Sequence, residues 1–425
     1  MPIFSHGTGR VLGRPQARVA ETPRCEPEGT AVCHDRPVRV LLAPDGFGSS
    51  LTAAQVAATV RDAWASVAPD DEIVLRPLSD GGPGFLDALR SLPGALVVPV
   101  SVPSPIGRPV PAEVLVVDGA VRTAYVETAQ AIGLPLVPAD RRDPGRTTTV
   151  GVGSLLEAAL RTGATRVVVG LGGSSTNDAG AGMLAGLGLE PAEVLAGGGG
   201  GLGVLGAGDL AGLPGLRERL RDVEILVATD VDVPLLGLTG ASAGFAAQKG
   251  ATPEQAQELE RQLDAFARAA VAALGDAVRP DLLGGRATVT RLTQAPGAGA
   301  AGGLGFGLSL LGARLVPGAA LVADLVGLDE ALAGVDLVVT GEGRFDWQSL
   351  HGKVASQVAT RALAAAVPTV VLAGEVSVGR RELLAAGITA AYAVGDTPEE
   401  VRAALADPVG SLRARAIRVA RTWSR

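Results

Sequence analysis

The stretch RVVVGLGGSSTND, residues 166–178, passes from a short apolar run into a glycine-rich turn that ends on an acid. Its first part, Arg166–Leu171, has the length and the valine content of a strand that is buried on both faces. A segment with helical spacing of apolar residues precedes it at 151–162. A strand that runs into a glycine-rich turn between helical segments is typical of α/β proteins with parallel sheets.

The same alternation continues on both sides of this stretch. We expect further strands within 38–45, 73–75, 225–229, 335–340 and 369–373, and further helices at 52–68, 252–274 and 354–366. Thr252 fits the N-cap of the long helix, with Glu254 in its first turn. The glycine run Gly197–Gly203 interrupts the pattern and is expected to form a surface loop between strands.

The composition narrows the class of protein. A chain of 425 residues is long enough for two domains of ordinary size, and 47% hydrophobic with only 3% aromatic residues indicates a core of Leu, Val and Ala. A net charge of −7 without a basic cluster argues against nucleic acid, and the apolar runs are too short to cross a bilayer. Cys25 and Cys33 form no CxxC motif. We therefore expect a cytoplasmic enzyme or binding protein.

Residues 1–36 are rich in Arg, Pro and Gly and lack the apolar segment of a secretory signal. Two interpretations stay open for residues 1–37. They form a disordered leader, or the protein starts near Val38, because a GTG start codon is translated as Val when it lies inside a longer frame. Neither interpretation gives this segment a catalytic role.

Lysine occurs at only two positions, Lys249 and Lys353, although Lys and Arg together number 37. In a chain that uses Arg as its general cation, a retained Lys is a candidate for a compact, mobile charge on a phosphate or a reacting oxygen. Both lysines lie in turns of small residues. The alternative is that both were left by chance on solvated loops.

Acids stand at the ends of several predicted strands, within or beside glycine-rich turns. They are Asp45, Asp80, Asp178, Asp230 and the pair Glu342 and Asp346. Open α/β sheets bind ligands beyond the carboxyl ends of their strands. Glycine lets backbone N–H groups approach an anion, and acids there hold Mg²⁺ or accept a hydroxyl proton. A single such acid is more often a helix cap, but the recurrence together with the two lysines favours phosphoryl transfer.

Two familiar nucleotide-binding motifs lack the sequence context that each of them requires. GAGAAG, residues 297–302, matches GxGxxG, but Pro296 precedes it and no predicted strand feeds it, so a dinucleotide-dependent oxidoreductase is only a minor alternative. Lys353 follows a Gly but precedes Val354 instead of Ser or Thr, so this is not a P-loop. Beyond residue 36, His351 is the only histidine, which argues against a histidine triad or a histidine-rich zinc site.

Taken in order along the chain, these motifs resemble the bacterial glycerate kinases of the two-domain α/β type. The resemblance covers about residues 38–400 and rests on APD with SLTA (43–45 and 50–53), LSDGG (78–82), VETA (126–129), TTVGVG (148–153), GLGGSSTND (170–178), TDV with PL (229–231 and 234–235), QKGA (248–251), a glycine run (297–305) and GEGR through Lys353 (341–353). The last segment is similar to the family pattern GEGR(L/F)DxQ(T/S)xxGK. Together with GGSSTND it is highly specific.

The resemblance implies ATP-dependent phosphorylation of D-glycerate, typically at the 2-hydroxyl, with Mg²⁺. It implies a flavodoxin-like (Rossmann-like) parallel-sheet domain from residues 38–83 plus 288–425, and a second α/β domain inserted at 84–287. The active site is then expected in the cleft between them. D-glycerate and ATP are the expected partners, nucleic acid and membrane are not, and a homodimer is one option for the assembly.

Three departures from the family pattern concern the expected substrate cleft. Gly48 replaces a Lys that is common in the family's DSFKGS, Pro83 replaces the Glu of DGGEGT, and Val233 replaces an Asn before Pro-Leu. We interpret them as marks of a subgroup with altered substrate preference, in preference to a weakened enzyme, because the acids and both lysines remain. A kinase for another small hydroxy acid and a non-catalytic sensor of glycerate or nucleotide stay open as alternatives.

Charge and reach suggest roles for the candidate residues. We expect Asp230 or Asp45 to orient the glycerate hydroxyl and take its proton, and Arg344 or Lys249 to bind the glycerate carboxylate. We interpret Trp347 as part of a packed cleft wall, in preference to a residue that stacks on adenine. The complete set comprises catalytic Asp45, Asp230, Lys249 and Lys353; substrate-binding Asp80, Arg344, Asn177 and Ser175; nucleotide-binding Gly172, Gly173, Gly299, Gly302 and Glu342; and metal-binding Asp346 and Asp178.

Overall fold

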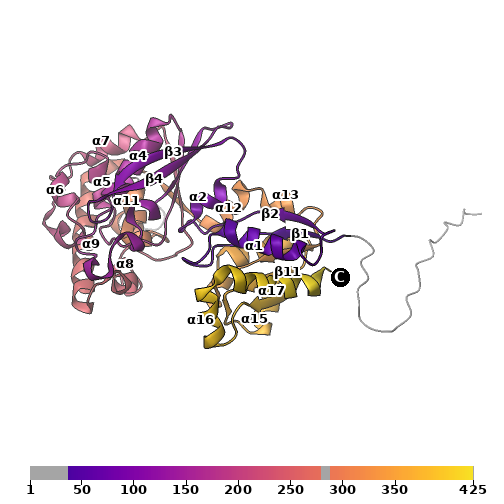
Figure 1. Ribbon diagram of the computed structural model, residues 1–425. Helices are drawn as coiled ribbons and strands as arrows, with labels where there is room; N and C mark the ends of the chain where they lie inside the picture. Colours follow the sequence, from indigo (N-terminus) through magenta and orange to yellow (C-terminus); the bar gives the residue numbers. More distant parts are fainter. Residues whose placement is uncertain (1–36, 279–287, 425) are drawn as a thin grey trace, which may run out of the picture.

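The computed structural model describes residues 37–278 and 288–424, so the expectations for residues 1–36 lie outside the described part. The described residues form two α/β domains, each built around its own sheet (Figure 1). One sheet is fully parallel and the other is mixed. The predicted fold class is therefore confirmed. No helix in the described residues is both long and apolar enough to cross a membrane.

The parallel sheet has five strands in the order β13-β11-β9-β1-β2. They are β1 (Arg39–Leu42), β2 (Glu72–Leu75), β9 (Leu337–Thr340), β11 (Thr369–Ala373) and β13 (Ala390–Ala393). Because β1 lies between β2 and β9, with Leu41 opposite Val338, the two ends of the described chain meet in one sheet. The carboxyl ends of all five strands point to the same edge.

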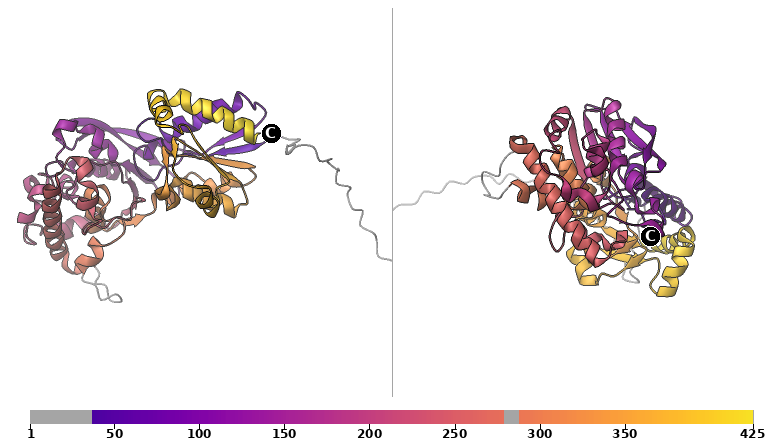
Figure 2. Two further views of the ribbon diagram at one scale, coloured as in Figure 1. Left: turned by 90° about the horizontal axis from the view of Figure 1, so that it is seen from below. Right: turned by 90° about the vertical axis from the view of Figure 1, so that its left-hand side faces the viewer.

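Helices cover both faces of the five-stranded sheet (Figure 2). They include α1 (Ala53–Ala65) and α17 (Pro408–Trp423) on one face, and α12 (Gly318–Leu325) and α14 (Val354–Ala364) on the other. The alternation of a strand explains this arrangement, because successive side chains point to opposite faces. Val40 and Leu42 pack with α1 and α17, whereas Leu41 packs with α12 and α14.

The mixed sheet has six strands in the order β3-β4-β5-β6-β7-β8. They are β3 (Ala95–Pro103), β4 (Pro109–Val117), β5 (Thr123–Glu127), β6 (Arg166–Gly170), β7 (Glu224–Ala228) and β8 (Arg314–Val316), antiparallel up to β5 and parallel from β5 onward. One face packs against α4 (Val150–Arg161), α5 (Ala181–Gly186), α9 (Pro253–Leu274) and α11 (Ala300–Leu310). Val167 and Val169 of the opening stretch point into this core.

The other face of the mixed sheet packs against the five-stranded domain. Val168 and Tyr125 share one apolar cluster with Leu41 and with the short helix α2 (Phe85–Leu89). The rings of Phe85 and Tyr125 lie 6.3 Å apart between centroids. The two domains are therefore joined by a common buried cluster.

From the sequence we expect the chain to return to the five-stranded domain at residue 288, whereas the strand pairing places this return later. Strand β8 pairs with β7 in parallel, with Leu315 opposite Val227, so it belongs to the six-stranded sheet. The chain reaches the five-stranded domain only with α12, directly after β8. We propose that the inserted domain extends to Val316. A three-residue strand has too little pattern to be detected by sequence periodicity.

The predicted strands and helices within the described residues are confirmed to within a few residues at their ends. Thr252 is the N-cap of α9, and its hydroxyl accepts the N–H of Gln255. The run 197–203 lies between β6 and β7 and is partly exposed, but it is not an irregular loop, because Gly199–Val204 forms a 3₁₀ helix. A Cβ on Gly199 would lie 2.1 Å from the carbonyl oxygen of Asn177, so glycine permits this helix to pack on the turn after β6.

The remaining elements are shorter. They include α3 (Ala129–Ile132), α6 (Ala192–Leu195), α7 (Leu213–Arg219), α8 (Ala241–Phe245), α10 (Thr288–Thr293), α13 (Leu328–Leu332), α15 (Arg380–Ala385), α16 (Pro398–Ala406), the 3₁₀ helix η6 (Trp347–Leu350), and a parallel two-stranded ribbon of β10 (Arg344–Phe345) and β12 (Glu375–Val376). This ribbon follows β9 and β11 and so lies at the carboxyl edge of the five-stranded sheet.

Candidate active site

The loops that leave β1, β2 and β9 lie side by side at the carboxyl edge of the five-stranded sheet. The N–H of Asp45 donates to the carbonyl of Gly341 at 2.8 Å, which joins the first loop to the loop after β9. The N–H of Leu78 donates to the carbonyl of Pro44 at 2.9 Å, which joins it to the loop after β2. These bonds bring the side chains of Asp45, Asp80 and Glu342 into one electrostatic group.

Burial and the charges of neighbouring acids raise the pKa values of Asp45 and Glu342. Burial, and then the charge of Asp80, raises the pKa of Asp45 well above its usual range. Burial raises the pKa of Glu342 to about 7. The nearby cation is Lys353, the N-cap residue of α14, whose charge opposes the rise in pKa of Asp45, Glu342 and Asp230. The structure therefore brings together four of the predicted acids and one of the two lysines.

Asp230 reaches this group from the other domain. It follows β7, and its carboxylate accepts the N–H groups of Gly318 at 2.7 Å and Ala319 at 3.0 Å, at the first turn of α12. Burial raises the pKa of Asp230 to about 7. A Cβ on Gly318 would lie 2.1 Å from the carbonyl oxygen of Asp80, so only glycine fits between the two acidic loops. Asp230 therefore caps a helix as well as lining the acidic group.

The carboxylate of Asp45 accepts fewer hydrogen bonds than that of Asp230. Its Oδ1 accepts the N–H of the adjacent Gly46 at 2.6 Å. Its second carboxylate oxygen has no hydrogen-bond partner in the described part of the chain. The Oε1 atom of Glu342 is buried and likewise has no partner there. A buried acceptor without a donor, such as Oε1 of Glu342, is costly in an isolated protein and is explained when a ligand, a proton or a cation completes it.

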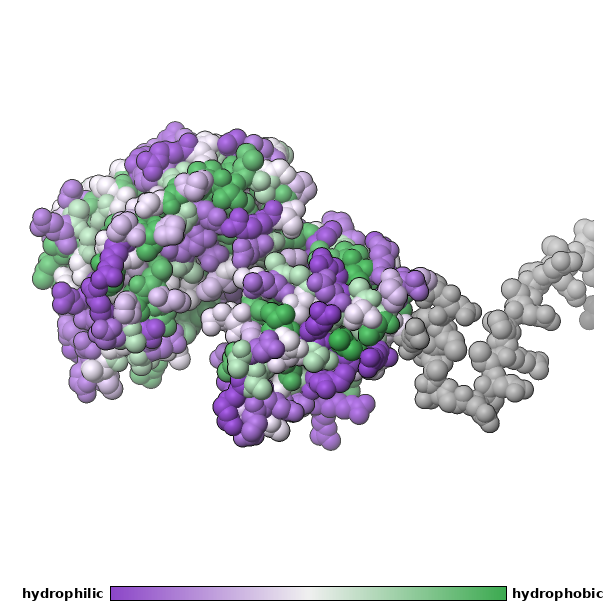
Figure 3. All heavy atoms as spheres, viewed as in Figure 1, coloured by the Kyte–Doolittle hydropathy of each residue, from purple (hydrophilic) through white to green (hydrophobic). Residues whose placement is uncertain are grey.

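A cavity of about 510 Å³ lies between the domains beside this group. Asp230, Asp232 and Gly297 line it from the six-stranded domain, and His351 and Gly352 line it from the five-stranded domain. The surface is visibly hollowed between the two domains (Figure 3). Ligand sites at domain interfaces are common, and this one adjoins the acids and Lys353.

Trp347 does not form a packed wall of the cleft. Its side chain is 66% exposed, and its ring contacts that of His351 at 4.3 Å between centroids. The Nδ1 atom of His351 lies 2.8 Å from the carbonyl oxygen of Trp347, which fixes this pair on η6. The expectation of a packed side chain is therefore wrong, because η6 stands at the surface.

The turn after β6 presents backbone donors. Within the described residues, the N–H groups of Gly172, Gly173 and Ser174 have no hydrogen-bond partner. A Cβ on Gly172 would lie 2.6 Å from the Cα of Gly82, so glycine lets this turn approach the Asp80 loop. Successive free N–H groups form a concave site for anions. Gly172 and Gly173 therefore stay candidates for binding a phosphate or a carboxylate.

Lys249 supports this turn from inside. Its ammonium donates to the hydroxyl of Ser174 at 2.9 Å and to the carbonyl of Thr176 at 2.6 Å, and the residue is 2% exposed. Burial lowers the pKa of Lys249 to about 7. The expectation that Lys249 binds the glycerate carboxylate is corrected accordingly. Its charge is used within the protein to hold the turn after β6.

Two further candidates of the same turn also point inward. The hydroxyl of Ser175 donates to the carbonyl of Ile132 at 3.0 Å, and the residue is 1% exposed. Asn177 is fully buried, and its Nδ2 donates to the hydroxyl of Ser242 at 3.0 Å. Their expected contact with substrate is not supported, because their polar groups are used to shape the turn.

Asp178 is not placed to bind a metal with Asp346. Its carboxylate is fully buried and accepts the N–H and hydroxyl of Thr149 and the N–H groups of Gly180 and Gly182. Burial raises its pKa, and these bonds oppose the rise. Asp346 lies in the other domain, where its Oδ1 accepts the N–H of Gln348 at 2.9 Å. The two predicted ligands are therefore separated, and Asp178 belongs to the core.

The glycine run 297–303 packs against the turn after β6. The N–H of Gly299 donates to the carbonyl of Val233 at 2.8 Å, so it is not free for a nucleotide. A Cβ on Gly302 would lie 1.9 Å from the carbonyl oxygen of Thr176. The helix α10, not a strand, precedes the run. The expected nucleotide contacts of Gly299 and Gly302 are therefore corrected, and these glycines serve close backbone packing.

Arg344 stands at the outer edge of the site. Its guanidinium side chain is 65% exposed and lies 3.4 Å from the carboxylate of Glu375 in the β10–β12 ribbon. An exposed ion pair of this kind adds little stability. The side chain therefore remains free to turn toward a ligand, but the structure shows no polar contact that directs it into the cleft.

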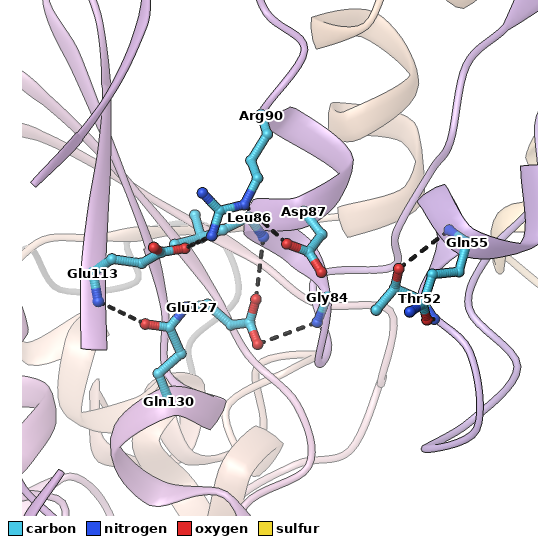
Figure 4. A network of polar contacts seen from close by, with 9 residues as sticks. All are labelled: Thr52, Gln55, Gly84, Leu86, Asp87, Arg90, Glu113, Glu127 and Gln130. Carbon is cyan, nitrogen blue, oxygen red and sulfur yellow. Dashed lines mark hydrogen bonds and ion pairs between the residues drawn. The ribbon is translucent and has the colours of Figure 1, made fainter. Parts of the chain in front are cut away.

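Glu127 is a site-shaping residue that the sequence motif VETA contained without revealing its role. It ends β5 and accepts the N–H groups of Gly84 and Leu86, both at 3.1 Å (Figure 4). The side chain is 8% exposed, and burial raises its pKa. Glu127 thus caps the first turn of α2 and fixes the chain directly after the Asp80 loop. A sequence offers no signal that pairs these positions, which are far apart along the chain.

Among the described residues, no three His, Cys, Asp or Glu side chains are grouped closely enough to hold a metal ion by themselves. This grouping does not conflict with Mg²⁺, which commonly takes one or two carboxylates together with phosphate oxygens and water. The buried, unpartnered Oε1 of Glu342 beside Asp80 and Asp45 fits a cation of this kind.

The fold and the site define a two-domain α/β protein with acids and a lysine in the cleft between its domains. The chain belongs to the glycerate kinase family, whose model matches residues 40–424. It is 41% identical over 385 residues to an uncharacterised protein of Mycobacterium bovis, covering 90% of this chain and 91% of that one. It is 38% identical over 345 residues to the glycerate 2-kinase of Escherichia coli K12, covering 80% and 86%.

A solved structure from Salmonella typhimurium LT2 that carries a glycerate kinase 2 name is also similar. The TM-score is 0.71 at 36% sequence identity, and the match covers 91% of this chain and 98% of that one. The similarity therefore extends over both domains.

Proposed function

We propose that this protein is an ATP-dependent kinase that phosphorylates D-glycerate at its 2-hydroxyl. Membership of the glycerate kinase family supports the proposal. The single observation that carries it is the position of Asp45, whose second carboxylate oxygen is unpartnered among the described residues and lies within the electrostatic reach of Lys353. An acceptor for a hydroxyl proton next to a compact cation is the arrangement that phosphoryl transfer needs.

The chemistry assigned to these residues is a direct transfer. The 2-hydroxyl oxygen of glycerate attacks the γ-phosphorus of ATP, the bond from this phosphorus to the bridging oxygen breaks, and ADP leaves. Asp45 takes the hydroxyl proton as the new O–P bond forms. Lys353 places its charge near the transferred group, because the ammonium is a small donor that tolerates changes of geometry.

The turn after β6 is suited to bind the carboxylate of glycerate or a phosphate of ATP. Its free N–H groups at Gly172, Gly173 and Ser174 lie against the Asp80 loop, which in turn joins the Asp45 loop. A carboxylate or phosphate bound there is held next to the acids without adding a charged side chain. We assign this turn to the glycerate carboxylate or a nucleotide phosphate, and Lys249 to the support of the turn.

Mg²⁺ belongs to the proposal through Glu342 and Asp80, with Asp346 as a further candidate because its charge acts on Glu342. When bound with the nucleotide, the ion would neutralise phosphate charge that these acids otherwise repel. Burial is the main cause of the raised pKa of Glu342 and of Asp45, and the charge of Asp80 adds to the rise in both. Binding of a cation there is expected to lower both pKa values.

The departures from the family pattern bear on substrate choice. Pro83 packs against the turn after β6, since a Cβ on Gly173 would lie 2.8 Å from its Cγ atom. Val233 lies equally close to Gly299, at 2.9 Å from a Cβ built there. Pro83 thus touches the turn assigned to the substrates, and a related small hydroxy acid is the second candidate substrate.

The test is incubation of the protein with ATP and Mg²⁺ and a set of small hydroxy acids, with ADP release measured by a coupled assay and the product identified by NMR. D-glycerate should give 2-phosphoglycerate, and Asp45→Asn should lower kcat by about 100-fold or more. A product from another acid but not from glycerate would replace the substrate assignment. Binding of glycerate or ATP without ADP release would support the sensor alternative.

A further inference from the structure

An apolar pocket lies at the carboxyl edge of the five-stranded sheet, outside the acidic group. Six of the residues that line it are Phe47, Gly343, Gly374, Val394, Ala404 and Leu412. Its volume, measured in the same way as that of the cleft, is about 80 Å³, and the pocket is open to solvent on one side. The loops after β1, β9, β11 and β13 form its floor, and α16 with the start of α17 forms its outer wall. We call it the edge pocket.

The outer wall of the edge pocket is loosely attached. None of the side chains of α16 is buried, although the helix has nine residues and a capping box at Thr397. Leu405, at the rim, is 66% exposed. A helix that covered only a structural core would bury an apolar stripe. The exposed apolar side chains of α16 are instead available to a ligand.

Glycines bring the loops at the floor of the edge pocket close together. A Cβ on Gly374 would lie 2.3 Å from the carbonyl oxygen of Gly343, and one on Gly343 would lie 3.1 Å from the backbone nitrogen of Gly48. The loops therefore approach one another closely at these positions. Parallel α/β sheets bind ligands in this position, beyond the carboxyl ends of their strands.

The edge pocket and the acidic group are formed by two of the same loops. Gly343 directly follows Glu342, and Phe47 lies on the same loop as Asp45. The helix α16 also lies on the side of its domain that faces the other domain, in both orientations of the molecule (Figures 1 and 2). A molecule that places a flat apolar part in the edge pocket therefore lies on the loops that also carry Asp45 and Glu342.

The polar groups at the pocket select among flat ligands. Glu375 and Ser50 line it, and the N–H of Gly343 has no partner within the described residues. A carboxylate accepts from an exocyclic amino group, and a free N–H donates to a ring nitrogen. Adenine offers both on one edge, whereas a uracil ring offers no amino group.

We propose that the edge pocket binds the adenine base of the nucleotide, between the loop at Gly343 and the helix α16. The inference rests on the proposed function, because it places the same ATP whose phosphates are assigned to the acidic group and Lys353. Ala404 then contacts the base from α16, and Phe47 contacts it from the loop after β1.

The test fills the edge pocket from its outer wall. Ala404→Phe occupies the space of the base, whereas Ala403→Phe adds the same ring at the exposed neighbouring position of α16. ADP affinity is measured by calorimetry without glycerate, and the KM values for ATP and glycerate are measured in the ADP-release assay. Ala404→Phe should weaken ADP and raise the KM for ATP by about tenfold or more, with the KM for glycerate unchanged. Ala403→Phe should match the wild type.

Two further measurements keep the outcome decisive. In the wild type, ADP should bind about tenfold or more tightly than UDP and should slow hydrogen exchange in α16. Wild-type ADP affinity in folded Ala404→Phe, or unchanged exchange in α16 at saturating ADP, overturns the edge pocket even if glycerate is phosphorylated. ADP binding that depends on Ala404 without any phosphorylation of glycerate would leave the pocket standing and remove the proposed kinase activity.

Discussion

The carboxylate of Asp230 accepts the backbone N–H of Gly318 at 2.7 Å, so an acid that ends a strand of the inserted domain caps the helix with which the chain returns to the other domain. The cap residue of α12 itself, Pro317, offers no side-chain acceptor. The geometry of the cleft and the start of α12 are therefore coupled through one side chain. This coupling separates two roles that the sequence could not distinguish for Asp230.

The capping role predicts a loss of stability. We expect Asp230→Ala to lower the free energy of unfolding by about 1–2 kcal/mol, because the first N–H groups of α12 lose their acceptor. Asp230→Asn should retain most of the stability, since its amide oxygen still caps the helix. Denaturant unfolding measures both. Asp232→Ala, an exposed acid of the same turn, is the control, and a loss as large there would refute the capping argument.

The proposed base predicts a loss of turnover without a loss of stability. We expect Asp45→Asn to lower kcat by about 100-fold or more, the usual contribution of a positioned proton acceptor. Its melting temperature should not fall, because burial already raises the pKa of Asp45 and the amide resembles the neutral acid. Asp230→Asn is the matched comparison and should keep most of its kcat. The reverse pattern would transfer the base to Asp230.

The sequence predicted where the site lies better than which side chains face it. Asp45 and Asp178 both follow a strand and a small-residue turn, yet only Asp45 has a free oxygen. The difference arises from Thr149 and Gly182, whose donors reach Asp178 from a helix far from the strand. Contacts of this kind depend on how helices pack, and the spacing of residues along one strand does not encode them.

The proposed extension of the inserted domain to Val316 depends on a contact of the same kind. Strand β8 has three residues, Arg314–Val316, and gains its place by pairing with β7. Long periodic segments such as α9 were predicted nearly to the residue, because an amphipathic pattern and an N-cap at Thr252 are local. The edge pocket had no sequence signal, since its floor is formed by four separate loops and its wall is a helix from the far end of the chain.

The two lysines should respond differently to the same substitution. Lys249→Arg places a longer, planar group in a space that fits an ammonium bonded to Ser174 and Thr176, so we expect a lower melting temperature. Lys353→Arg lies at a half-buried helix start and should fold normally but lose kcat/KM by about tenfold or more, because a fork replaces a point charge. Calorimetry and the ADP-release assay on one preparation separate the effects. Normal melting of Lys249→Arg together with lost activity would restore Lys249 to the catalytic group.

The buried acids predict a definite sign for the pH dependence of stability. The pKa of Glu342 is raised from 4.5 to about 7, so between these pH values the folded protein keeps a proton that the unfolded chain has released. Its contribution to stability is therefore fully present below about pH 4.5 and is lost as the pH rises through about 7. The contribution of Asp230 to stability falls with pH in the same way, between about pH 3.8 and about 7. Lys249 acts oppositely above about pH 7, because its lowered pKa makes the folded state gain stability toward 10.5.

Glu342→Gln isolates the contribution of one of these acids. The amide cannot ionise, so we expect the difference in melting temperature, variant minus wild type, to increase from pH 5 to pH 8, because only the wild type loses stability as Glu342 ionises. Glu375→Gln, a more exposed acid of the β10–β12 ribbon, is the control for the loss of a carboxylate as such. Mg²⁺ with ADP should reduce the slope of the wild type, since a cation beside Glu342 stabilises its ionised form. A flat difference for Glu342→Gln would show that Glu342 ionises at its ordinary pKa and would remove it from the proposed cation site.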